Sequence, residues 1–198
     1  MNGGLRAAGN ARRRWARALV FASGGLFGAC ASAPPATYDL GVIQGGFKAR
    51  PRGGQIAVYE PKAVSPVASD RIVVRLGADQ IAYLSGAQWA GQLPALVQAR
   101  LISSFLNAHV IGAVEPDGIA DYNLRTTIRR FEFDAGRAAV FVEMSAQLAD
   151  SSGRVRAGKV FSASAPAPGD DAATVTQALD FALAEVMRQI VLWTAPQI

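Results

Sequence analysis

Reactive side chains are scarce in this chain of 198 residues, which contains one cysteine and one histidine. One cysteine excludes an internal disulfide, and one cysteine with one histidine cannot form a zinc or iron site from soft ligands. Long apolar runs are also missing after the first 30 residues, so we expect no transmembrane helix there. Hydrophobic residues still make up 51% of the sequence, which excludes a disordered tail and predicts a single domain with a proper core.

Charge of one sign is in excess only at the N-terminus, although the whole sequence has a net charge of +5. Five arginines precede Asp39, the first acidic residue, and leave 15 basic residues against 15 acidic ones in the rest of the chain. Those five are Arg6, Arg12, Arg13, Arg14 and Arg17. A protein that binds nucleic acid needs a clustered basic face to displace counterions from phosphates. The sequence therefore predicts no nucleic-acid partner.

Motifs of common enzyme classes are missing as well: there is no G-x-S-x-G elbow and no G-x-x-x-x-G-K-S/T phosphate loop. The one imidazole, His109, follows a predicted helix, where a cation favours the helix dipole, so capping is favoured over general-base work. Glu132 and Asp134 lie two apart on one strand and form a candidate acid pair, but a solvated turn face is favoured. We therefore expect no enzyme activity, no catalytic residue and no metal site.

The N-terminal arginines belong to a predicted targeting segment, residues 1–29. They precede an apolar run over residues 18–29, whose 12 residues are too few for a membrane-spanning helix, which needs about 20. This layout is typical of a secretory signal that is removed from the mature protein. The arginine run leaves open whether export follows the general or the twin-arginine route.

The single cysteine ends a stretch that resembles a bacterial lipobox, Leu26-Phe27-Gly28-Ala29-Cys30, with Phe27 where such boxes usually have Leu. The resemblance implies cleavage between Ala29 and Cys30 and a diacylglycerol on the Cys30 thiol. Two or three acyl chains, palmitate among them, bind a membrane stably where one chain would not. Ala31 follows the cysteine in place of Asp, which by resemblance to sorted lipoproteins implies the outer membrane. Residues 30–37 are rich in Pro and Ala and suit a tether.

The domain is predicted to span residues 38–198, with strands, a helix, strands and a second helix. Sequence patterns predict strands at 38–44, 55–59, 71–76, 81–84, 124–133, 140–148 and 155–164, with a flexible Gly/Pro connection over 45–54. A shift of the apolar face near Arg129 indicates a bulge. Apolar residues three and four apart, from Trp89 to Phe105, predict a helix over 93–107. Asp170 or Asp171 is the expected cap of a closing helix whose apolar stripe ends at Trp193.

This order of elements predicts the fold class α+β: a single-domain sandwich of a mainly antiparallel sheet with two helices packed on one face. Tyr83 and Trp89 are candidates for a lipid-binding or partner-binding lip, although the apolar spacing favours core packing for Trp89. Three arginines of the strand at 124–133 either bind anionic headgroups or protect an exposed strand face; they are Arg125, Arg129 and Arg130.

Several short strings occur in the same order as in one family of envelope lipoproteins. They are Ser69-Asp70-Arg71-Ile72-Val73-Val74-Arg75, Ile81-Ala82-Tyr83-Leu84-Ser85-Gly86-Ala87-Gln88-Trp89-Ala90 and Leu93-Pro94-Ala95-Leu96-Val97-Gln98-Ala99-Arg100-Leu101, with Tyr38-Asp39-Leu40-Gly41 before them and Asp121-Tyr122-Asn123-Leu124 and Ile190-Val191-Leu192-Trp193-Thr194 after them. Together with the lipobox, they make the chain similar to the ABC-type transport auxiliary lipoprotein family, which includes paraquat-inducible protein C.

The resemblance implies a non-enzymatic lipoprotein on the periplasmic face of the outer membrane. It implies work with an ABC transporter that carries mammalian-cell-entry (MCE) substrate-binding subunits and moves lipids between the two membranes. The resemblance implies a functional role for Cys30 alone, as the residue that carries the covalent lipid. We expect no other cofactor. The sequence leaves open whether the protein forms a homo-oligomer. Two other classes also stay open, an outer-membrane assembly factor similar to the lipopolysaccharide-assembly lipoprotein and an envelope hydrolase.

Overall fold

The computed structural model describes residues 34–41 and 47–198. A group of strands precedes each of its two α-helices. In chain order the elements are β1 (Ala36–Tyr38), β2 (Ile56–Val58), β3 (Arg71–Arg75), β4 (Ile81–Trp89), α1 (Leu93–Asn107), β5 (Ala113–Val114), β6 (Tyr122–Asp134), β7 (Ala139–Asp150), β8 (Val155–Pro166), α2 (Ala172–Thr194) and the short 3-10 helix η1 (Ala195–Gln197).

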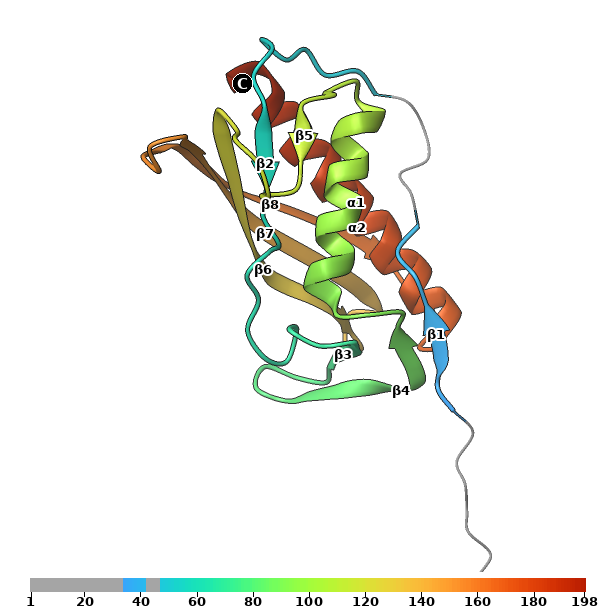
Figure 1. Ribbon diagram of the computed structural model, residues 1–198. Helices are drawn as coiled ribbons and strands as arrows, with labels where there is room; N and C mark the ends of the chain where they lie inside the picture. Colours follow the sequence, from blue (N-terminus) through green and yellow to red (C-terminus); the bar gives the residue numbers. More distant parts are fainter. Residues whose placement is uncertain (1–33, 42–46) are drawn as a thin grey trace, which may run out of the picture. The chain divides into compact units, whose positions relative to one another are not determined.

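Long strand β6 organises the sheet, because both of its edges are used (Figure 1). One edge pairs antiparallel with β7, which in turn pairs antiparallel with β8. The other edge is shared by two short parallel partners, β2 alongside Tyr122–Leu124 and β3 alongside Glu132–Asp134. The β6–β7 register shifts between Ile128 and Arg130, so the bulge predicted near Arg129 is confirmed.

The remaining strands extend the sheet in a mixed arrangement. β4 pairs antiparallel with β3 and carries β1 parallel on its outer side, and β5 pairs parallel with β2. Both helices lie on the same side of this curled sheet (Figure 1). The predicted α+β class and single domain with two helices on one face are confirmed. Each parallel pair includes at least one of the short strands β1, β2 and β3.

Both helices follow their apolar stripes. α1 has the predicted bounds, Pro94 lies in its first turn, and Val97 and Leu101 are among its buried residues. Asp171 is the residue that caps α2: its side chain accepts a hydrogen bond from the Thr174 N–H at 3.0 Å. α2 packs on β7 and β8, and α1 lies against α2, β2 and β5. The side chains of β7 alternate between buried and partly exposed, as the sequence predicts.

Two predicted elements need correction. The strand expected at 38–44 instead covers Ala36–Tyr38, because β1 pairs with β4 only where Ala36 to Tyr38 face Ala87 to Trp89. Residues 42–46 lie outside the described part. Trp89, expected in the helix stripe, is the last residue of β4, and β4 is longer than the predicted strand at 81–84.

The part of the Gly/Pro connection that is described, residues 47–54, has no regular secondary structure. The Ala49 N–H donates to the Ala108 carbonyl at 3.1 Å, and Phe47 and Ala49 pack against the core. None of the helices in the described ranges is long and apolar enough to cross a membrane.

Candidate functional site

The segment that leads from the tether into the domain is fixed to both helices. After β1, the Gly41 N–H donates to Asp180 Oδ1 on α2 at 2.9 Å. Arg100 on α1 forms an ion pair with the same carboxylate and donates a second hydrogen bond to the Asp180 carbonyl at 3.2 Å. We call Gly41, Arg100 and Asp180 the N-terminal junction. It joins three segments that are far apart in the sequence.

Arg100 is the unusual member of this junction because it is buried, with 5% of its surface exposed. A buried guanidinium is tolerated only when it is paired and hydrogen-bonded, which the Asp180 contacts provide. The Arg100 Nε has no hydrogen-bond partner within the described residues. Arg100 lines a hollow of about 220 Å³ together with Asp39, Leu40 and Leu96. The sequence carried a signal for this burial, since Arg100 lies three residues after Val97, on the buried side of α1.

Tyr83 and Trp89, the candidates for an interface lip, have different environments. Tyr83 is half-buried, and the Arg71 guanidinium lies 3.9 Å from the centre of its ring. Trp89 is 1% exposed and packs edge-on against Phe131, with ring centres 5.8 Å apart. Trp89 therefore belongs to the core, the interpretation that its spacing favoured, and only Tyr83 reaches the surface.

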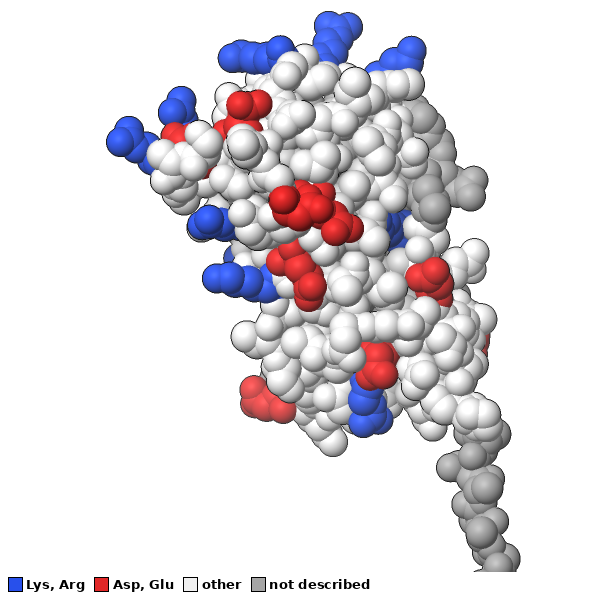
Figure 2. Space-filling view, viewed as in Figure 1, with Lys and Arg blue, Asp and Glu red and all other residues white. Residues whose placement is uncertain are grey.

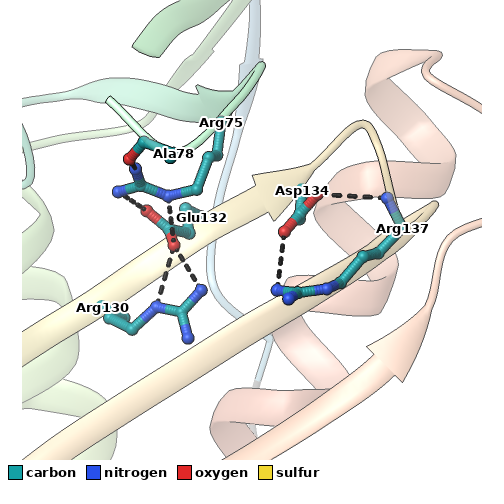
Figure 3. A network of polar contacts seen from close by, with 6 residues as sticks. All are labelled: Arg75, Ala78, Arg130, Glu132, Asp134 and Arg137. Carbon is teal, nitrogen blue, oxygen red and sulfur yellow. Dashed lines mark hydrogen bonds and ion pairs between the residues drawn. The ribbon is translucent and has the colours of Figure 1, made fainter. Parts of the chain in front are cut away.

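Two carboxylates of β6 lie in a network of arginines rather than on a solvated turn face (Figure 3). Glu132 accepts hydrogen bonds from Arg75 Nε and Nη2, both at 2.9 Å, and from Arg130 at 2.7 and 2.9 Å. Asp134 accepts from the Arg137 backbone N–H and side chain, both at 3.1 Å. Both carboxylates are buried, so the favoured sequence interpretation of a solvated face is wrong.

The arginine network also determines whether Glu132, a member of the candidate acid pair, is suited to act as a general acid. Burial is the largest influence on Glu132 and raises the pKa of its carboxyl, but hydrogen bonds and charge from Arg75 and Arg130 outweigh it. The net result is a pKa below the ordinary value, which keeps Glu132 ionised at neutral pH. A general acid needs a proton to give, so this carboxylate is suited to holding β3 against β6.

The other arginines named from the sequence also have partners. Arg129 forms an ion pair with Glu143 at 3.1 Å, and the Arg125 guanidinium lies 5.6 Å from the centre of the Tyr59 ring. His109 is exposed just after α1 with φ of 62°, and its backbone N–H donates to the Leu106 carbonyl at 3.0 Å. It thus lies at the end of the helix, where the sequence placed it. Across residues 34–41 and 47–198, no three His, Cys, Asp or Glu side chains are grouped to hold a metal ion.

The comparison with known families is decisive for the whole domain. Residues 38–191 match the model of the ABC-type transport auxiliary lipoprotein component. The chain belongs to this family. The resemblance seen in the sequence is thereby confirmed, and the match runs from the end of β1 almost to the end of α2.

Relatives of this auxiliary lipoprotein share its fold along most of its length. A crystal structure of a protein from Xanthomonas campestris has 30% identity and a TM-score of 0.73, and covers 81% of this chain and 95% of that one. PelC from Paraburkholderia phytofirmans, a dodecamer, has 12% identity and a TM-score of 0.50 over 78% of this chain and 95% of that one, which shows a shared fold alone.

A curated relative comes from Bradyrhizobium diazoefficiens, an uncharacterised protein that is 33% identical over 174 residues. The match covers 85% of this chain, and the chain spans about half the length of that relative, 47%. The family is described as the lipoprotein component of ABC-type transport, a description that names no enzyme activity.

The residues expected to carry the anchor lie outside the described part. They are the signal segment 1–29, the cleavage site at Ala29 and Cys30, and residues 30–33 of the tether. What the structure adds is the point where the tether ends: β1 begins at Ala36, six residues after Cys30.

Proposed function

We propose that this auxiliary lipoprotein is anchored through a lipid on Cys30 in the outer membrane, on the periplasmic face, and docks an ABC transporter with MCE-domain subunits. The transporter moves lipids between the two membranes, and the domain holds it in place. The observation that carries this proposal is the family match over residues 38–191, which includes both helices and the sheet.

The chain ahead of the domain supports the anchoring part. A cysteine after an apolar run of 12 residues is the acceptor that a lipoprotein signal requires, and two or three acyl chains hold a protein on a bilayer. The six residues from Cys30 to Ala36 reach about 20 Å at most when fully extended. A domain on so short a tether stays close to the membrane in which Cys30 is anchored.

The N-terminal junction supports the docking part. Any pull between the membrane and the transporter would enter the domain where the tether joins β1. Gly41 is tied to α2 through Asp180, and α1 is tied to the same carboxylate through Arg100, so tension on β1 reaches both helices. The sheet alone would offer β1 only its short pairing with β4.

The test is membrane separation combined with a lipid measurement. Outer and inner membranes are separated by density from cells with the wild-type gene, without the gene, and with Cys30→Ser. The proposal predicts the wild-type protein in the outer membrane and an altered phospholipid composition of that membrane in both other strains. The protein in the inner membrane, or unchanged lipids without the gene, would contradict it.

A further inference from the structure

The end of the domain farthest from the tether has a surface with unusual composition. β1 pairs with the last residues of β4, four residues before α1 begins, so the tether enters at the N-terminal end of α1. Residues 47–54 lie at the other end, because the Ala49 N–H bonds to the Ala108 carbonyl just after α1. The 15 residues of α1 separate the two ends by about 22 Å.

Segment 47–54 carries three basic residues and no acidic one. Lys48, Arg50 and Arg52 are all exposed, and they occupy alternate positions. No acidic side chain in residues 34–41 and 47–198 forms an ion pair with them, whereas seven other basic residues there are paired. The rest of the chain adds no candidate, since the first acidic residue is Asp39 and residues 42–46 are uncharged.

The picture of the surface agrees with this placement. Figure 2 shows basic side chains along the upper margin of the domain, at the end where Figure 1 places residues 47–54, and acidic side chains below them on the face in view. The Ile198 carboxylate also lies at this end, because the Arg52 backbone N–H donates to an Ile198 oxygen at 2.5 Å. Three basic side chains that form no ion pair in the described ranges outnumber this carboxylate and favour a negatively charged contact.

Exposed aliphatic side chains lie beside these charges. Between α1 and β6, Ile111 is 85% exposed, Ile119 is 96% exposed and Val114 is exposed as well. Leu106, in the last turn of α1, is also exposed. Residues 47–54 are packed against the loop that follows α1. The Ile56 N–H, just after this segment, donates to the Gly112 carbonyl at 2.8 Å, and a Cβ at Gly112 would meet the Gly54 carbonyl oxygen at 2.8 Å. A substituted residue at 112 would therefore push the segments apart.

We call this combination the distal surface; its residues are Lys48, Arg50, Arg52, Leu106, Ile111, Val114 and Ile119. We propose that the distal surface is the docking site for a protein partner whose own surface places acidic side chains around an apolar centre. The inference deepens the proposed function and rests on it, because the partner is the MCE-domain subunit of the transporter.

A protein partner fits this surface better than a membrane does. Aliphatic and basic groups together also suit anionic lipid headgroups. However, Glu115 and Asp117 lie on the same loop, between Ile111 and Ile119, and both are exposed. A uniformly anionic bilayer would repel these carboxylates, whereas a folded partner places each charge separately. Anionic lipid is therefore the alternative that the experiment must distinguish.

The first measurement is the affinity of the full, acylated lipoprotein in detergent for the purified MCE-domain subunit. Arg50→Glu with Arg52→Glu is compared with wild type and with Lys62→Glu and Lys159→Glu, exposed basic residues of other segments that also lack ion pairs in the described ranges. We expect the distal pair to weaken binding about tenfold or more and the control pair to stay within about twofold. Wild-type binding should also weaken between about 50 and 200 mM salt.

A second pair of variants tests the apolar part. Ile119→Asp should weaken binding by a similar factor, and Val64→Asp, at a position that is 77% exposed elsewhere, should not. Since both side chains are exposed, the fold tolerates both changes, and equal melting temperatures confirm this. The same proteins are also incubated with vesicles of phosphatidylglycerol and with neutral vesicles.

The outcomes separate the inference from the proposed function. Unchanged affinity of the Arg50→Glu, Arg52→Glu protein for the subunit would overturn the distal docking site and leave the proposed function standing. Loss of vesicle binding without loss of subunit binding would also overturn it, in favour of a lipid contact. If wild-type protein does not bind the subunit at all, the proposed function fails and the inference fails with it.

Discussion

Arg100 on α1 and Asp180 on α2 form an ion pair in which the arginine side chain is 4% exposed and the aspartate side chain 35% exposed. The same carboxylate accepts the Gly41 N–H from the segment that follows β1. A buried charge thus lies where the incoming tether meets both helices.

Removal of the Asp180 charge should destabilise the domain. Asp180→Asn leaves the Arg100 guanidinium buried without a counter-charge and should cost about 2 kcal/mol of unfolding free energy, less than for a fully buried pair because Asp180 is partly exposed. Chemical denaturation followed by tryptophan fluorescence measures it. Asp117→Asn, at an exposed position, is the control, and an equal cost in both variants would show that the pair contributes nothing.

The network around Glu132 predicts a pH dependence. The pKa of Glu132 is lower in the folded protein than its ordinary value of 4.5, so the stability it contributes is complete above that pH and is lost as pH falls through the folded-state pKa. Glu132→Gln should cost about 1–3 kcal/mol at neutral pH. Wild type should then lose more stability than the variant between about pH 5 and pH 3. Parallel stability curves for the two proteins would refute this role.

Leu93, in the first turn of α1, is 1% exposed and lies in the core. Leu93→Ala should lower the free energy of unfolding by about 2–5 kcal/mol, because the variant loses buried apolar surface and leaves a cavity. Leu106→Ala, on the same helix but 46% exposed, is the matched control and should cost far less. Unchanged stability of Leu93→Ala together with lost partner binding would move this end of α1 to an interface.

Cys30 tests the anchor. Cys30→Ser removes the acylated thiol and with it about 0.8 kcal/mol for each buried methylene of the acyl chains. The variant should be soluble in the periplasm or retained as the uncleaved precursor, and it should incorporate no radiolabelled palmitate. Palmitate labelling of the variant at the wild-type level would place the lipid elsewhere.

The helices were predictable from the sequence because each contains its own signal. Pro94 and the apolar stripe through Leu101 determine α1, and Asp171 with the stripe after it determines α2. Two long alternating runs predicted β6 and β7 for the same reason. These patterns depend on neighbours within a few residues, which a sequence shows directly.

The shortest strand and most partners of the buried charges were not predictable in this way. β5 has two residues and is a strand only because it pairs with β2, which lies within the strand expected at 55–59. β4 continues to Trp89 because Gly86 adopts φ of 68° within it, next to the register shift with β3. Asp180 lies 80 residues from Arg100, and Arg75 lies 57 residues from Glu132, so only the fold identifies these two partners.

Purification of the acylated lipoprotein from envelope extracts, with its partners identified by mass spectrometry, tests the central claim most directly. The account predicts an ABC ATPase, a permease and an MCE-domain subunit with the wild-type protein, in amounts that also give the number of lipoprotein copies per transporter. Recovery of an outer-membrane barrel without any transporter subunit would contradict it and would indicate an assembly factor instead.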